Sequence, residues 1–202
     1  MTIRPCLTLG LLICSLMAGH LFAAPLPGAA PGDLIFREGT APVSDVVISV
    51  DEGRFSHVGM LARRDGAWEV IHATPSERAG RPDGVVIDAL NFFIAPARAR
   101  HWQVYHVANA TSAQRAQAVR WARAQTGTPF DVLGTTGTYC TTLVWAAWQQ
   151  AGLDLQARFT RLHIPLAQGD FLLPSGLLAS PLLSPLLSAP EHDSTAETAL
   201  SR

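Results

Sequence analysis

The chain has 202 residues, 48% of them hydrophobic, and its 15 basic and 16 acidic side chains leave a formal net charge of -1 at pH 7. This length suits a single globular domain with a sizeable core. The near-neutral balance, with no basic stripe and no long acidic run, gives no electrostatic basis for binding nucleic acid. No nucleic-acid partner is therefore expected.

The amino terminus has the pattern of a secretory signal peptide. Arg4 supplies a positive start, the apolar run at 7–18 is too short to span a bilayer, and Ala23 and Ala24 follow as small residues. We expect residues 1–24 to be removed on export to a bacterial periplasm or cell envelope, which leaves a mature chain without a transmembrane span. The sequence does not fix the cleavage bond, and an uncleaved membrane anchor is the alternative.

Export changes what the cysteines can do. Cys6 and Cys14 lie in the expected signal peptide, so the mature chain would hold Cys140 alone. Exported domains usually use cysteines in disulfide pairs. A lone cysteine is either a buried, inert thiol or a reactive one, and its neighbours must decide between the two.

Strand patterns dominate the first half of the expected domain. Asp65 and Gly66 separate two of these segments and predict a tight hairpin, because both residues tolerate positive φ. A short stretch at 44–50 reads as helical or extended. The segments rich in aromatic and β-branched residues are 32–37, 55–63, 67–74, 84–90 and 101–108.

Two helices are predicted in the second half. Thr111 and Gln114 form a capping box that opens a helix at 113–125. A second helix at 140–151 ends at Gly152. One face of this second helix carries a stripe at three- and four-residue spacing, made of Cys140, Leu143, Val144, Ala147 and Ala151.

The carboxyl-terminal tail is rich in Ser, Pro, Leu and Ala, and Pro181, Pro185 and Pro190 argue against a helix there. We expect residues 184–202 to be a disordered, low-complexity tail and residues 32–183 to form the folded domain. The overall pattern predicts an α+β domain, a mostly antiparallel sheet with a few helices packed on it.

Cys140 stands at the first turn of the second predicted helix. Unpaired backbone N–H groups at such a terminus favour a thiolate, the nucleophilic form of cysteine. Backbone N–H groups near Tyr139 and Cys140 could also hold a developing oxyanion. Catalysis at Cys140 would still require a general base.

The base is expected from the hairpin. A two-residue Asp65-Gly66 turn puts His57 and His72 on one face, so His72 can orient His57 as the third member of a triad orients its base. Glu69 falls on the opposite face, and a three-residue loop would favour it instead.

A metal site is the alternative reading of two histidines on one hairpin face. Zinc would want a third protein ligand. No metal-binding spacing is present, so no metal and no cofactor are expected. The residues that could be proposed as that third ligand are Cys140, His101, His106 and Asp131.

Four motifs, "PGDLIFR", "SHVGM", "GTPFD" and "YCTTLVWAAWQQAG", resemble in this order the permuted papain-like amidases of the YiiX type, within the wider NlpC-type cysteine hydrolases. The resemblance spans roughly residues 32–183. It implies a permuted papain-like fold, a mostly antiparallel sheet or half-barrel with a nucleophile-bearing helix packed against it. In this permuted order the histidine precedes the cysteine.

The resemblance implies Cys140 as the nucleophile and His57 as its base. The third polar position is often an acid in the family, and His72 occupies it here, with Glu69 as the weaker candidate. Asp131 in "GTPFD" is read as structural. The segment "LLPSGLLASP" resembles the family's carboxyl-terminal segment, which closes the fold.

Three functions follow as expectations. The first is an exported cysteine hydrolase that cleaves an amide bond through a thioester acyl-enzyme, acting on a cell-wall peptide or a small acylated amine. The second keeps the nucleophile but acts as an acyltransferase or thioesterase on acyl-lipid substrates. The third is a non-catalytic envelope-binding module. An apolar groove beside Cys140 would favour acyl chains, whereas a polar, acidic cleft would favour peptides or amines.

Overall fold

A computed structural model describes residues 26–133, 136–164 and 167–188, so the expected signal peptide lies outside the described residues. Its main sheet has six strands in the order β4-β3-β2-β1-β5-β8, and all neighbouring strands are antiparallel. This confirms an α+β domain built on a mostly antiparallel sheet. The strands, in chain order, are β1 (Leu34–Gly39), β2 (His57–Arg64), β3 (Ala67–Thr74), β4 (Gly84–Ala89), β5 (Ala99–Val107) and β8 (Leu183–Ser188).

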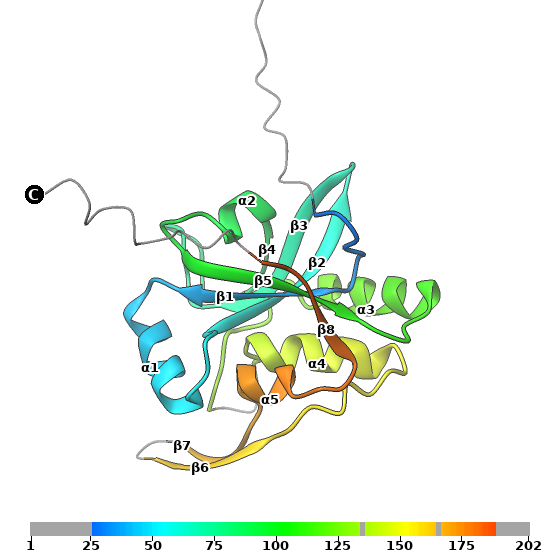
Figure 1. The fold of residues 1–202 in the computed structure, drawn as a ribbon. Coiled ribbons are helices and arrows are strands. Elements are labelled where there is room, and N and C mark those ends of the chain that lie inside the picture. Colours follow the sequence, from blue (N-terminus) through cyan, green and yellow to red (C-terminus); the bar gives the residue numbers. More distant parts are fainter. Residues whose placement is uncertain (1–25, 134–135, 165–166, 189–202) are drawn as a thin grey trace, which may run out of the picture.

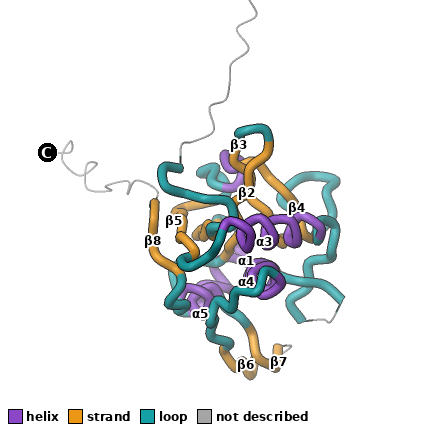
Figure 2. The backbone as a smooth tube through the Cα atoms, turned by 90° about the vertical axis from the view of Figure 1, so that its right-hand side faces the viewer, coloured by secondary structure: helices purple, strands orange, loops and turns teal. Residues whose placement is uncertain are grey.

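Helices cover the sheet, and a small separate hairpin lies apart from it, below α5 in both views (Figures 1 and 2). The two longest helices, α3 (Ser112–Ala124) and α4 (Cys140–Gln150), pack against each other and against the sheet. Among the described residues, none of the helices is long and apolar enough to cross a membrane. The remaining elements are α1 (Pro42–Asp51), α2 (Leu90–Phe93), α5 (Pro174–Leu178) and the hairpin of β6 (Thr160–Ile164) and β7 (Ala167–Phe171).

Alternation along the strands divides the core between the two faces of the sheet. Phe36, Val58 and Met60 face α3 and α4 in the larger cluster. Their neighbours in the chain, such as Ile35 and Leu61, point to the other face. There they pack with α2, whose Phe93 is fully buried. Both faces of the sheet are therefore apolar and covered, which is why its strands carry long buried runs.

The β2–β3 hairpin has the geometry that its turn residues predict. Asp65 and Gly66 both take positive φ, at 51° and 81°. The strands pair in the register expected of a two-residue loop, with Met60 opposite Ile71. The turn thus fixes which side chains of β3 lie on the face of His57.

The two predicted helices are confirmed. Thr111 and Gln114 form the reciprocal capping box that starts α3. The stripe predicted on α4 is buried against the sheet from Cys140 to Ala151. The stretch left open between helix and strand is the helix α1, which begins at Pro42, where the missing N–H of proline costs nothing.

The prediction of a disordered tail from residue 184 was wrong for its first residues. Strand β8 pairs with β5, with Ser184 opposite His106, and so extends the sheet past the expected domain boundary. The prediction rested on side-chain composition, whereas β8 is held by backbone pairing with β5, which that composition does not indicate. The rest of the tail, from residue 189, lies outside the described residues.

Candidate active site

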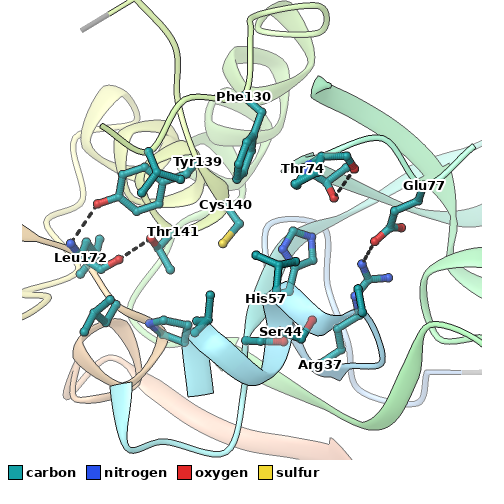
Figure 3. A pocket seen from close by; sticks show the side chains of 18 of the residues that line it. Arg37, Ser44, His57, Thr74, Glu77, Phe130, Tyr139, Cys140, Thr141 and Leu172 are labelled. Atoms are coloured by element: carbon teal, nitrogen blue, oxygen red, sulfur yellow. Dashed lines mark hydrogen bonds and ion pairs between the residues drawn. The ribbon is translucent and has the colours of Figure 1, made fainter. Parts of the chain in front are cut away.

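Cys140 and His57 open onto the same cavity, which has a volume of about 200 Å³. Cys140 is the first residue of α4, and His57 is the first residue of β2. Figure 3 shows the sulfur of Cys140 pointing toward the ring of His57, with no hydrogen bond joining the two. Two elements far apart in the chain therefore present a thiol and an imidazole to one space.

The start of α4 is fixed by contacts on both sides of Cys140. The hydroxyl of Tyr139 accepts a hydrogen bond from the Leu172 N–H at 3.0 Å. The hydroxyl of Thr141 donates to the Leu172 carbonyl at 2.6 Å. These two bonds hold the segment after β7 against the helix terminus, and this segment supplies one wall of the cavity (Figure 3).

His57 and His72 are hydrogen bonded to each other, as the hairpin register predicted. Nε2 of His57 lies 2.8 Å from Nδ1 of His72. His72 is fully buried, and the ring of Phe93 packs against both imidazoles, at centroid distances of 5.6 Å and 5.1 Å. Nδ1 is thus the ring nitrogen of His57 that remains for the cavity.

Glu69, the other residue proposed to orient His57, points to the opposite face of the sheet. Its carboxylate forms an ion pair with Arg123 of α3, on the face of the sheet that α3 and α4 cover. The two-residue turn therefore brings His72 to His57 and holds Glu69 away from it.

Asp88 of β4 is a site residue that the sequence did not indicate. Its Oδ2 lies 3.2 Å from Nε2 of His72, and its side chain is 2% exposed. Arg81 and Arg78 contact its other oxygen at 2.8 Å and 3.2 Å. The register of β4 would have placed Asp88 on the face of His72, but nine loop residues (75–83) separate β3 from β4 and leave that register unspecified.

Burial dominates the electrostatics of the thiol and the imidazole. It raises the pKa of the Cys140 thiol to about 11, although the backbone amides of Val58 and Thr141 and the charge of Arg37 oppose the shift. Burial likewise lowers the pKa of His57 well below its ordinary value, and the charge of Arg37 adds to this effect. The amides at the helix terminus therefore favour a thiolate, as expected, but the effect of burial on the Cys140 thiol is larger and favours its neutral form.

One of the two amides expected to hold an oxyanion is already engaged. The N–H of Tyr139 donates to the hydroxyl of Thr142 at 3.1 Å. The amides of Cys140 and Thr141 instead lie toward the thiol, where they lower its pKa. An oxyanion formed at Cys140 would therefore meet the amides of Cys140 and Thr141 rather than that of Tyr139.

The cavity has a polar end and an apolar end. The buried Arg37 and the partly exposed Glu77 form an ion pair at the polar end (Figure 3). The apolar end extends from Cys140 between α1, the loop before α4 and the segment after β7. Its apolar lining residues are Val43, Val47, Phe130, Val132, Phe171, Leu172, Leu173 and Pro174.

The residues proposed as a third metal ligand have other surroundings. His106 lies 3.1 Å from the buried carboxylate of Asp33, and His101 stacks on Phe55. Asp131 accepts a hydrogen bond from the Leu133 N–H within its own loop, in line with a structural role. Within the described part of the chain, no group of three or more His, Cys, Asp or Glu side chains could hold a metal ion.

An antiparallel sheet whose histidine strand precedes a cysteine helix defines the class of permuted papain-like hydrolases. The chain belongs to the permuted papain-like amidase family named YaeF/YiiX, C92, whose model matches residues 28–173. This family is of the cysteine amidase or peptidase type.

A solved structure shares the fold. It is the crystal structure of a protein titled metalloprotein yiiX, from Escherichia coli O157:H7, with a TM-score of 0.66 and 21% sequence identity. The similarity covers 80% of this chain and 98% of that one. No curated protein matches the chain.

Proposed function

We propose that this protein is an exported cysteine hydrolase that cleaves an amide bond through a thioester acyl-enzyme. Cys140 is the nucleophile, His57 the base, and His72 orients His57. The observation that carries the proposal is the meeting of the Cys140 thiol and the hydrogen-bonded His57–His72 pair at one cavity. Membership of the amidase family supports the reaction type.

In the proposed reaction, Nδ1 of His57 accepts the proton of the Cys140 thiol while the sulfur forms a bond to the amide carbonyl carbon. The carbonyl oxygen becomes an oxyanion, held by the amides of Cys140 and Thr141. When this intermediate collapses, the C–N bond breaks and the imidazolium of His57 gives its proton to the leaving amine. A water molecule, deprotonated by the same nitrogen, then adds to the thioester and releases a carboxylic acid and the free thiol.

Substrate binding has to assist the first step. The neutral thiol and imidazole are not joined by a hydrogen bond in this structure, and catalytic bonds of this kind often tighten only when substrate is bound. A bound carbonyl supplies the site where negative charge develops, next to the helix amides. Proton transfer then occurs together with the attack rather than before it.

The lining of the cavity favours a substrate with an apolar acyl group. The acyl part would lie against the apolar end, between Val47, Phe130 and Leu173, and the leaving amine would face the polar end near Glu77. A small acylated amine satisfies both ends. A cell-wall peptide would have to place an apolar side chain at the apolar end.

The proposal is tested with the purified protein on N-acyl amides that carry a short, a medium or a long linear acyl chain. We expect hydrolysis that rises with chain length, and Cys140→Ala is expected to abolish it while leaving the unfolding transition unchanged. His57→Gln is the matched variant, since it keeps a polar side chain but no base, and kcat should fall by about 10²-fold or more. Retained turnover in Cys140→Ala would refute the mechanism.

Acyl transfer is the second candidate, and the same apolar lining favours it. A thioester on Cys140 can pass its acyl group to an amine or a hydroxyl instead of water. Adding a primary amine or an alcohol to the hydrolysis assay separates the two functions. An acyltransferase makes the new amide or ester at the expense of the free acid, whereas a hydrolase gives the acid throughout.

Export is supported by the amino-terminal pattern of Arg4, the apolar run at 7–18 and the small residues after it. Mass spectrometry of the protein from fractionated bacterial cells tests this. A periplasmic or envelope protein that lacks about the first 24 residues is expected, and a cytoplasmic protein that keeps Met1 would contradict it.

A further inference from the structure

We propose that Asp88 is a positioning residue that sets the tautomers of His72 and His57, so that the ring nitrogen facing Cys140 is a proton acceptor. The inference rests on the proposed function only for its catalytic consequence. Its structural part concerns the three buried side chains His57, His72 and Asp88, called below the His–His–Asp array.

The array crosses three adjacent strands. His57 is on β2, His72 on β3 and Asp88 on β4, joined by contacts of 2.8 Å and 3.2 Å. Val86 is paired with His72, and Asp88, two residues further along β4, therefore lies on the same face of the sheet. Asp88 does not line the cavity, so it can act on Cys140 only through the two imidazoles.

The carboxylate of Asp88 is ionised and can only accept hydrogen bonds. Burial alone would raise the pKa of Asp88, but the hydrogen bonds from His72 and Arg81 overcome this and lower it well below its usual range. Arg78 adds a second guanidinium at 3.2 Å, and this guanidinium also lies over the ring of Phe92. The two arginines thus hold one carboxylate oxygen and turn the other toward His72.

Because the Asp88 carboxylate can only accept a hydrogen bond, it determines the direction of both hydrogen bonds in the array. Nε2 of His72 must carry its proton to donate to Asp88. Because burial lowers the pKa of His72 and of His57, both rings are neutral and carry one proton each. Nδ1 of His72 is then an acceptor, Nε2 of His57 is the donor to it, and Nδ1 of His57 is left with the lone pair that a base needs.

The opposite set of tautomers would disable the base. If the side chain at position 88 donated a hydrogen bond to Nε2 of His72, the protons of His72 and His57 would both move from Nε2 to Nδ1. Nδ1 of His57 would then carry a proton toward the thiol and could not accept one. Asp88→Asn permits this reversal, because an amide offers a donor with almost the same shape as the carboxylate.

The wild-type protein itself provides the first test. Nitrogen-15 NMR of the histidine-labelled full chain distinguishes protonated from unprotonated ring nitrogens. We expect His57 and His72 both to carry the proton on Nε2. A proton on Nδ1 of either ring would overturn the proposal, whether or not any amide substrate is ever hydrolysed, so this outcome is separate from failure of the proposed function.

Asp88→Asn provides the second test. We expect the tautomers to invert in the spectrum and kcat to fall by up to about 10⁴-fold, the scale of the loss when an amide replaces the carboxylate of a catalytic triad. KM should stay within about threefold, since Asp88 does not touch the cavity. Asp65→Asn, on the exposed β2–β3 turn, removes the same charge and should change neither measurement.

The outcomes separate clearly. Unchanged tautomers together with unchanged kcat in folded Asp88→Asn would overturn the proposal. Inverted tautomers with unchanged hydrolysis would show that His57 is not the base, and would count against the proposed function rather than against the array. If Asp88→Asn does not fold, the wild-type spectrum alone decides.

Discussion

The thiol of Cys140 lies at a helix N-terminus, which favours the thiolate, but burial favours its neutral form. It begins a helix, where backbone amides favour negative charge, yet it is only 9% exposed, and loss of solvation outweighs those amides. The neighbouring imidazole is affected in the same direction, because burial and Arg37 both disfavour its cationic form. Both shifts favour a neutral thiol and a neutral imidazole over a thiolate–imidazolium ion pair.

This neutral pair predicts a specific pH dependence of alkylation. The pKa of Cys140 is about 11, so the thiolate fraction is small at pH 7 and rises with pH toward that value. Iodoacetamide should therefore modify Cys140 more slowly than a model thiol at pH 7, with a rate that climbs until about pH 11. The rate is measured by mass spectrometry, with Cys140→Ala as the blank. A plateau reached below pH 7 would contradict the prediction, because it is the signature of an ion pair.

At the scale of residues, local chemistry indicated part of the candidate site. Cys140 and His57 could be proposed from their neighbours, and His72 followed from a turn whose type the Asp65-Gly66 pair determines. Asp88 could not be found in this way, since its place opposite β3 depends on a register that a nine-residue loop leaves open. The raised pKa of Cys140 also had no signal in the sequence, because it results from tertiary burial.

At the scale of elements, β2 and β3 approach closely where they carry the two histidines. Gly59 permits this approach. A Cβ atom at Gly59 would lie 2.3 Å from Cγ1 of Val70 and 3.2 Å from Cβ of His72. Neither distance leaves room for a methyl group beside the fully buried Val70. The absent side chain of Gly59 therefore allows His72 to reach His57.

We predict that Gly59→Ala destabilises the protein by about 1–3 kcal/mol through overpacking, and that it lowers kcat by displacing His72. Val70→Ala makes room for the added methyl group. The double variant should therefore be less destabilised than the sum of the two single variants, by about 1 kcal/mol. Urea unfolding of the four proteins measures this coupling. If the destabilisation of the double variant equals the sum of the two single variants, a clash with Val70 is not what destabilises Gly59→Ala.

Elements with a strong local pattern were predictable, including the strands β1, β4 and β5, whereas β8 and α2 were not. The hairpin turn and the α3 capping box specify β2, β3 and α3 through residues adjacent in the chain. Strand β8 has no such signal, since its segment, which contains Pro185 and two serines, becomes a strand only by pairing with β5. The short helix α2 was also missed, although its Phe93 shields both histidines.

At the scale of the whole molecule, covering both faces of the sheet creates the electrostatic setting of the site. The helices α3 and α4 cover one face, and α2 with the segment around Leu26 covers the other. The His–His–Asp array lies in this interior, away from water, and burial therefore disfavours imidazolium at His57 and at His72. The fold as a whole, rather than any single contact, keeps the two rings neutral.

Two buried neutral histidines predict that the free energy of unfolding depends on pH. Their folded pKa values lie below the unfolded value of about 6.5, so the stabilisation is fully present above pH 6.5 and is lost as the pH falls. Each proton taken up only by the unfolded chain contributes a slope of about 1.4 kcal/mol per pH unit. Two such protons give a limiting slope of about 2.7 kcal/mol per pH unit.

Urea unfolding between about pH 7.5 and pH 4.5 measures this slope, in a window above the titration of Asp88. The double variant His57→Gln/His72→Gln removes both titrating rings and keeps two polar side chains in their place. We therefore expect the stability difference between wild type and the double variant to shrink as the pH falls below 6.5. A difference that stays constant over this range would mean that the folded protein can protonate both rings, and that the covered sheet does not exclude charge from its interior.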